Sequence, residues 1–95
     1  MSFRVVVTRT AARQLAEHLP EAAAAACIEF IFGPLAENPE RVGTPLRMPF
    51  EGQWRARRGE YRVRYRIEQS DELVYVLDVD HRRTPTGADD NPSRS

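Results

Sequence analysis

The chain has 95 residues, of which 41% are hydrophobic and 29% charged, as expected for one soluble globular domain. Its 14 arginines balance 14 acidic residues, and no apolar run approaches the ~20 residues of a membrane-spanning helix. The chain starts directly in an apolar segment, without the basic region and long apolar stretch of a signal peptide. We therefore expect a cytoplasmic protein with no membrane partner.

The first half of the chain predicts one strand followed by two helices. Residues 3–8 are rich in valine and alternate in polarity, which favours a strand, and Thr8 or Thr10 can cap the following helix. Pro20 suits the first position of a second helix, which should bend or end near Gly33 and Pro34, with Pro39 as a firmer stop. Apolar residues at helical spacing predict that both helices cover a sheet: Ala12, Leu15, Ala16, Leu19, Ala23, Cys27, Phe30, Ile31 and Leu35.

The second half predicts antiparallel strands. Residues 46–48 suggest a short edge segment, residues 53–58 a strand, and Gly59 with Glu60 a two-residue turn. Residues 61–67 place Tyr, Val, Tyr and Ile on one face and three arginines on the other, and residues 73–80 form a more apolar strand. The fold class is therefore α+β: an N-terminal strand, a helical hairpin, then antiparallel strands in a twisted sheet. We expect one domain over residues 1–83 and a disordered tail over residues 84–95.

Positive charge is concentrated in one part of the chain. Residues 41–66 contain eight arginines against Glu51 and Glu60, whereas the other acids lie in the helical half and the tail. The neutral total thus hides a basic face, which is typical of proteins that bind nucleic acid. Taken alone, however, a row of arginines on one strand face is more often a solvated surface.

The segment GQWRARRGEYRVRYRI resembles the pattern of RelE-like toxins of the RelE/ParE toxin-antitoxin superfamily. The matching positions are Gly52, Trp54, Arg55, Arg57, Gly59, Glu60, Tyr61, Arg62 and Tyr65. Asn38-Pro39, Gly43 and residues 45–47 match the family's approach to this segment, and residues 79–82 resemble its final strand. The resemblance covers residues 3–83 and implies the RelE-like fold.

This resemblance implies the toxin of a type II toxin-antitoxin system, a ribosome-dependent mRNA endonuclease that inhibits translation. It further implies three partners, a cognate antitoxin, mRNA and the ribosome, and a small toxin-antitoxin hetero-oligomer. Cleavage in this family starts from the 2′-hydroxyl of the RNA and needs no cofactor. The reaction needs a base for that proton, positive charge around the phosphate and an acid for the leaving 5′-oxygen.

The resemblance implies a site made of Arg55, Arg57, Arg62, His81 and Arg82. Arginine donates paired hydrogen bonds to phosphate oxygens but stays protonated at physiological pH, so the four arginines are assigned phosphate binding. The best-known branch of the family has lysines at the first two positions, and this departure weakens any proton-transfer role for Arg55 or Arg57.

The proton acceptor is harder to assign. Many relatives carry a tyrosine a few residues beyond the final basic pair, and this chain has Gly87 there. His81 is our first choice because imidazole exchanges protons near neutral pH, followed by Glu60 or Asp80.

Other residues in the same region have simpler interpretations. We expect Arg64 and Arg66 to be solvated or to face the antitoxin, and Arg58 to be structural or at the rim of the site. Tyr65 should lie in the core, and Trp54 suits either the core or base stacking. Cys27 suits a small buried thiol. Two separated histidines and one cysteine predict no metal site.

Two other functions fit the same sequence. A ParE-like toxin would inhibit DNA gyrase through protein contacts and would need no nuclease residues, which the missing tyrosine favours. A catalytically degenerate family member would bind its antitoxin or the ribosome without cleaving RNA. The retained arginines favour the nuclease.

Overall fold

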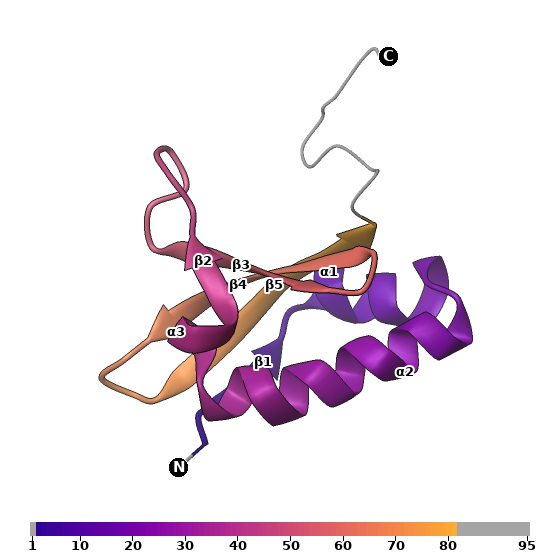
Figure 1. Cartoon of the computed structure of the whole chain (residues 1–95), viewed down its shortest axis with the longest axis horizontal. Helices are drawn as coiled ribbons and strands as arrows, with labels where there is room; N and C mark the ends of the chain where they lie inside the picture. Colours follow the sequence, from indigo (N-terminus) through magenta and orange to yellow (C-terminus); the bar gives the residue numbers. More distant parts are fainter. Residues whose placement is uncertain (1, 82–95) are drawn as a thin grey trace.

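The computed structural model describes residues 2–81 as two layers, with the helices packed on one face of a twisted sheet (Figure 1). Within these residues the opposite face of the sheet is open, and the loop between β2 and β3 rises beside it (Figure 1). The arrangement confirms the α+β class and the expected order of a strand, helices and then strands. In chain order these are β1 (Arg4–Val7), α1 (Arg9–Arg13), η1 (Gln14–His18), α2 (Glu21–Phe30), η2 (Ile31–Leu35), α3 (Pro39–Val42), β2 (Gly43–Pro45), β3 (Gln53–Arg58), β4 (Tyr61–Glu68) and β5 (Leu73–His81).

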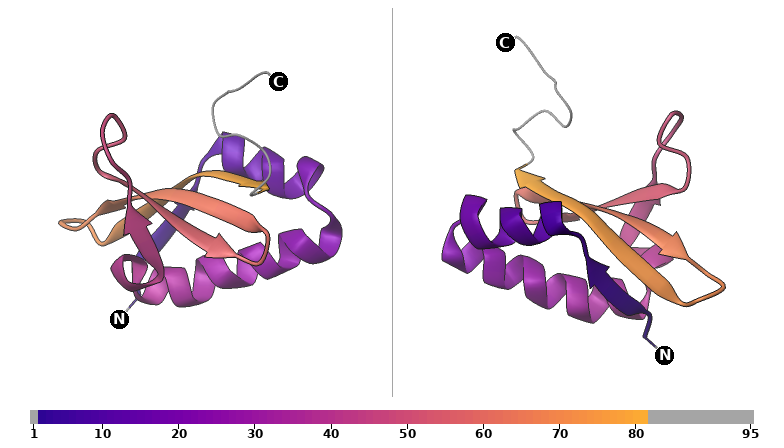
Figure 2. Two further views of the ribbon diagram at one scale, coloured as in Figure 1. Left: turned by 45° about the horizontal axis from the view of Figure 1, so that its top comes forward. Right: turned by 180° about the vertical axis from the view of Figure 1, so that it is seen from behind.

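The described residues form a five-stranded mixed sheet in the order β1-β5-β4-β3-β2. The four later strands pair antiparallel, as the sequence predicts, whereas β1 joins β5 in parallel at the outer edge (Figure 2). This places β4 at the centre of the sheet, between β5 and β3.

The helices begin and end partly as expected. The Thr8 side chain caps α1 by accepting a hydrogen bond of 3.3 Å from the Ala11 amide. The second helix does not stop at Gly33 or Pro34 but continues through them as the π-helical turn η2. Proline has no amide hydrogen and crowds the preceding turn, and the wider turn relieves both problems.

Pro39 is the helix stop that the sequence predicts, because the helix ends before it and Asn38 leaves the helical conformation. Pro39 then begins α3, where its missing amide hydrogen is not needed. Two local predictions were wrong. The edge strand lies at residues 43–45 instead of 46–48, because the chain turns directly after Leu46 and the Phe50 amide bonds the Arg47 carbonyl at 2.9 Å. On the first helix, Ala11 is the buried alanine, whereas Ala12 and Ala16 are exposed.

The core lies between the two layers. The inward side chains of β4 and β5 pack against α2 and η2, and the fully buried members include Val63, Tyr65, Val74, Val76, Val79, Cys27, Ile31 and Leu35. The Tyr65 hydroxyl donates a hydrogen bond of 2.5 Å to the Pro39 carbonyl, which ties α3 to the centre of the sheet.

A β-bulge divides β5 into two halves, and the alternation of inward and outward side chains shifts by one residue between them. Val76 pairs with Tyr65 and Asp78 pairs with Arg64, so Leu77 is an extra residue on β5. Val74 and Val76 face the helices before the bulge, and Val79 faces them after it. Asp78 and Asp80 are thereby turned to the open face of the sheet.

Within residues 2–81, no helix is long and apolar enough to cross a membrane. Arg82 and the expected tail at residues 84–95 lie outside the described residues.

Candidate functional site

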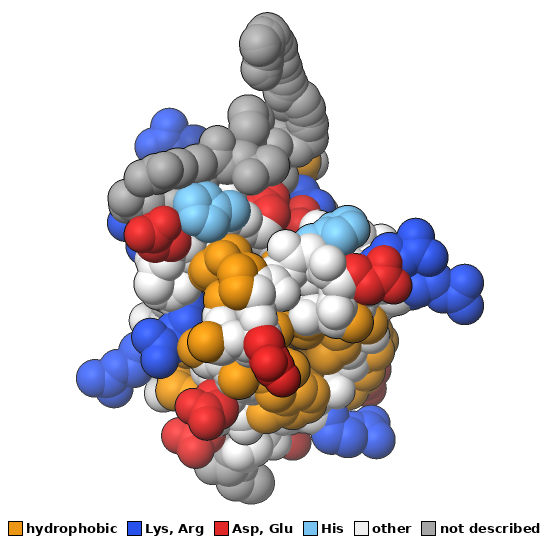
Figure 3. All heavy atoms as spheres, turned by 90° about the vertical axis from the view of Figure 1, so that its right-hand side faces the viewer, with side chains coloured by type: hydrophobic (Ala, Val, Ile, Leu, Met, Phe, Trp, Pro, Cys, Tyr) orange, Lys and Arg blue, Asp and Glu red, His pale blue; other side chains and the backbone are white. Residues whose placement is uncertain are grey.

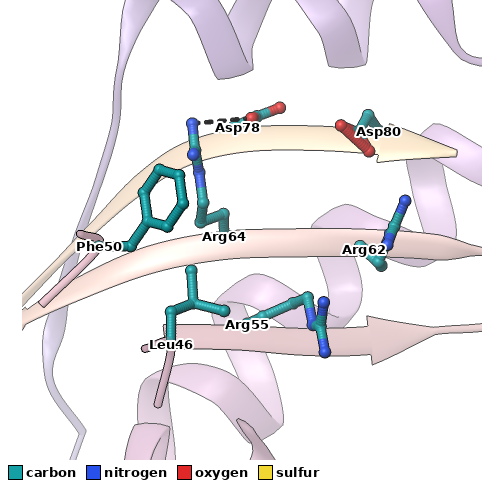
Figure 4. Close-up of a pocket in the computed structure, with 7 residues that line it drawn as sticks. All are labelled: Leu46, Phe50, Arg55, Arg62, Arg64, Asp78 and Asp80. Carbon is teal, nitrogen blue, oxygen red and sulfur yellow. Dashed lines mark ion pairs between the residues drawn. The ribbon is translucent and has the colours of Figure 1, made fainter. Parts of the chain in front are cut away.

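A hollow of about 140 Å³ lies on the open face of the sheet. Its floor is formed by β3, β4 and β5, and one wall is formed by Leu46 and Phe50 from the segment between β2 and β3 (Figure 4). Three guanidinium groups and two carboxylates line it, those of Arg55, Arg62, Arg64, Asp78 and Asp80.

Strand alternation explains why the arginines gather here. Arg55 lies opposite Arg64 in the pairing of β3 with β4, and Arg57 lies opposite Arg62. Since successive side chains of a strand point to opposite faces, all four share the open face, while Ala56 and Val63 point into the core. The basic segment of the sequence thus becomes one basic surface of the sheet.

The carboxylates come from β5. Asp78 is the cross-strand partner of Arg64, and Asp80 is the partner of Arg62. Figure 4 shows Asp80 above Arg62 on the neighbouring strand, and Arg64 reaching across to Asp78. Each acid therefore lies beside an arginine of β4.

Arg64 is held on two sides within the hollow. Its guanidinium forms an ion pair of 2.9 Å with Asp78 and lies 6.0 Å from the centre of the Phe50 ring. Only 27% of its side chain is exposed. Arg64 is therefore not a freely solvated side chain, because the loop wall and Asp78 enclose it, and the alternative that it faces the antitoxin stays a prediction.

The structure brings together some of the expected site residues. Arg55 and Arg62 line the hollow, and Arg57 lies next to Arg62 on the same face without lining it. Arg82 lies outside the described residues.

His81 lies on the other face of β5. It pairs with Tyr61, whose ring packs against the core and meets the imidazole edge-on at 5.1 Å. Its Nε2 atom lies 3.0 Å from Glu60 Oε1, so two of the expected proton acceptors contact each other. Figure 3 shows the two histidines of the chain on one end of the molecule, each beside an acidic side chain. This position separates His81 from the arginine hollow.

The remaining basic and aromatic residues have structural surroundings. Arg58 lies on the helix side of β3, where it borders the same surface hollow as Cys27, and Arg66 is exposed beside Glu68 at 3.5 Å. Trp54 packs against the core, which favours its structural interpretation. Burial raises the pKa of the Cys27 thiol, although the charge of Arg58 lowers it slightly, so the thiol stays neutral at physiological pH.

Sequence reasoning missed Arg64, Asp78 and the apolar wall of Leu46 and Phe50. Alternation does assign Arg64 to the same face as Arg62, and that was the available signal. Asp78 gave no such signal, because its orientation depends on the bulge.

Comparisons with known proteins agree on one family. Residues 5–85 match the family model of the ParE toxin of the type II toxin-antitoxin system parDE. The chain is 50% identical over 80 residues to Toxin RelE of Mycobacterium tuberculosis, covering 84% of this chain and 81% of that protein. It is 48% identical over 82 residues to Toxin RelG of the same organism, covering 86% of this chain and 93% of that protein.

Solved structures give the same result. The toxin-antitoxin complex RelBE2 of M. tuberculosis contains a chain that superposes with a TM-score of 0.83 at 45% identity, covering 88% of this chain and 95% of that one. The archaeal RelE-RelB complex of Pyrococcus horikoshii matches with a TM-score of 0.60 at 22% identity, covering 90% and 100%, and shows the shared fold. The chain therefore belongs to the RelE/ParE superfamily and is the toxin component of a type II toxin-antitoxin system.

Proposed function

We propose that this toxin is a ribosome-dependent mRNA endoribonuclease that uses the arginine hollow to bind the scissile phosphate. The observation that carries the proposal is the convergence of Arg55, Arg62 and Arg64 in one hollow on the open face of the sheet. A phosphodiester that becomes more negative in the transition state is stabilised by guanidinium groups already held in position. The relatives named RelE support the same activity.

Within this proposal, Arg55 and Arg62 bind the phosphate directly. Arg57, the cross-strand neighbour of Arg62, extends the basic surface along the RNA backbone. Arg82 keeps the phosphate-binding role implied by the resemblance. The toxin acts in the cytoplasm, where translating ribosomes supply the mRNA.

The deciding experiment maps mRNA breaks in a translating extract with wild type, Arg62→Ala and Arg66→Ala. Arg66 is a matched control because it lies on the same strand and face but is 58% exposed and paired with Glu68 outside the hollow. Loss of one preorganised cationic group should lower the cleavage rate of Arg62→Ala about 10²-fold or more. Arg66→Ala should cleave like wild type. Intact transcripts with the wild type, or equal rates for the two variants, would contradict the proposal.

A ParE-like action on DNA gyrase is the second candidate, and the ParE description of the matching family model favours it. The same translating extract distinguishes mRNA cleavage from inhibition of gyrase. If translation continues with intact transcripts while DNA supercoiling fails, the toxin acts on gyrase; if neither process fails, it is a degenerate member.

We further propose that a cognate antitoxin neutralises the toxin in a small hetero-oligomer by covering the hollow. The matched M. tuberculosis structure is itself a toxin-antitoxin complex. A basic surface is best covered by a segment that presents acidic side chains. A complex of the two proteins that left the hollow open would argue against this arrangement.

A further inference from the structure

Cleavage from the 2′-hydroxyl sets a strict condition on where the proton acceptor lies. The 2′-oxygen and the phosphorus it attacks belong to adjacent positions of one nucleotide, and they approach to about 3 Å before reaction. A base for the 2′-hydroxyl must therefore lie on the same face as the phosphate-binding arginines and next to them. Among the described residues that line the hollow, Asp78 and Asp80 carry the proton-accepting groups.

Asp78 is held deep in the hollow, with both of its oxygens facing protein groups. One oxygen, Oδ2, forms the 2.9 Å ion pair with Arg64, and the other, Oδ1, accepts a hydrogen bond of 3.1 Å from the Gln14 side chain. Only 13% of its side chain is exposed. Its contacts make it a group that positions Arg64.

Asp80 has the required placement. It is the register partner of Arg62 on the adjacent strand, lines the same hollow, and is turned toward the open face by the bulge (Figure 4). An RNA phosphate bound by Arg62 would bring its neighbouring ribose against this carboxylate. His81, one residue further along, lies on the opposite face against Tyr61 and Glu60.

We infer that Asp80 is the general base of the proposed RNA cleavage, and this inference rests on the proposed nuclease function. The Asp80 carboxylate takes the proton of the 2′-hydroxyl, and the freed electron pair forms the bond from the 2′-oxygen to phosphorus. The bond from phosphorus to the 5′-oxygen breaks, and that oxygen takes a proton from solvent water. The products are a 2′,3′-cyclic phosphate and a 5′-hydroxyl, with no oxidant or co-reactant involved.

The test measures single-turnover cleavage on programmed ribosomes for wild type, Asp80→Asn, His81→Ala and Asp71→Asn. Asparagine keeps the shape of the side chain, and Asp71 is an exposed acid in the turn before β5 that serves as the matched control. Asp80→Asn should cleave at least ~10²-fold more slowly, whereas the control Asp71→Asn should keep the wild-type rate. His81→Ala tests the rival base and should lose less of the rate than Asp80→Asn. Thermal unfolding of each variant verifies that it is folded.

Measuring the binding affinity for RNA distinguishes two roles of Asp80, that of a general base and that of a charge that only maintains the shape of the hollow. Affinity is measured with ribosomes programmed by mRNA carrying a 2′-deoxynucleotide at the scissile position, which cannot be cleaved by this route. Asp80→Asn should bind as tightly as wild type or more tightly, because it removes a negative charge next to the phosphate. A loss of affinity that matched the loss of rate would overturn the inference.

A third measurement distinguishes a general base from a general acid. It uses a substrate with sulfur in place of the scissile 5′-oxygen, because the sulfur leaves without needing a proton and a general acid is then dispensable. Asp80→Asn should remain slow on this substrate. Rescue of its rate would identify Asp80 as the acid and overturn the inference, as would wild-type cleavage by Asp80→Asn or a slow His81→Ala beside a fast Asp80→Asn. In each of these cases the wild type still cleaves, so the proposed function survives; intact mRNA with the wild type would overturn both.

Discussion

Gly43 lets β2 pack closely against β3, the strand that carries Arg55. A side chain at this position would clash with the Tyr65 hydroxyl and would lie 2.8 Å from the Arg55 carbonyl oxygen. The clash partners are a core side chain and the backbone of β3, and neither can yield easily. Only glycine lets β2 approach β3 this closely.

We therefore expect Gly43→Ala to lower the free energy of unfolding by about 2 to 3 kcal/mol, as overpacking of a filled site does. Gly33→Ala is the matched control, because a methyl group there meets nothing within 4 Å and alanine stabilises a helix by about 0.5 to 1 kcal/mol relative to glycine. Urea unfolding midpoints measure both. Equal midpoints for the two variants would refute this account of Gly43.

At the level of elements, the bulged region of β5 is fixed by the segment that follows β1. The Thr8 hydroxyl lies 2.8 Å from the Val76 carbonyl oxygen and 3.2 Å from that of Leu77. The Gln14 side chain accepts a 2.7 Å hydrogen bond from the Val79 amide and donates one to Asp78. Because β1 pairs with β5 only as far as Val76, these two side chains continue the pairing where the strand ends.

Replacing Gln14 with alanine should leave the Val79 amide and Asp78 without these hydrogen bonds, at roughly 1 to 3 kcal/mol of unfolding free energy. Gln69→Ala removes an exposed hydrogen bond of 2.8 Å to Glu40 and should change stability by less than ~0.5 kcal/mol. Chemical denaturation of the two variants gives the comparison. A Gln14→Ala variant as stable as Gln69→Ala would show that the bulge does not depend on this side chain.

The same elements show how far the sequence predicts the structure. The alternation from Tyr61 to Ile67 correctly predicts which side of β4 is buried, because that strand has no irregularity on its own side of the pairing. In β5 the same rule places Val74 and Val76 on one face with Asp78 and Asp80, which the bulge reverses. The parallel pairing of β1 with β5 also has no local signal, since it joins segments about 69 residues apart.

The candidate site was also only partly predictable from the sequence. Arg55 and Arg62 were expected from the family resemblance, and the regular alternation of β3 and β4 then places both on one face. The hollow itself could not be predicted, because its wall comes from a loop without periodicity and its acids from the irregular half of β5.

At the scale of the whole molecule, Tyr65 joins the sheet to the segment after the helices. Its side chain is fully buried, and burial raises the pKa of its hydroxyl from 10.0 to about 12. The hydroxyl is protonated in the folded protein over a wider pH range than in the unfolded chain. The stability that this provides is complete below pH 10 and is lost as the pH rises through 12.

We expect the free energy of unfolding to fall by about 2 kcal/mol between pH 9 and pH 11.5 through Tyr65 alone. Tyr65→Phe should be less stable at pH 8, because it lacks the hydrogen bond to the Pro39 carbonyl, but should lose less stability over this range. Urea midpoints across the range test both statements. Parallel curves for the two proteins would contradict them.

The bulge at Leu77 also gives β5 one residue more than its pairing with β4 needs. Removing the Leu77 codon would join Val76 to Asp78, and regular alternation would then keep Val79 inward and both carboxylates on the open face. Removing Val79 while the bulge stays would instead bring Asp80 opposite Val63, on the side of the sheet that faces the helices. The strand that carries Asp80 should therefore tolerate the loss of its bulged residue but not the loss of a residue beyond it.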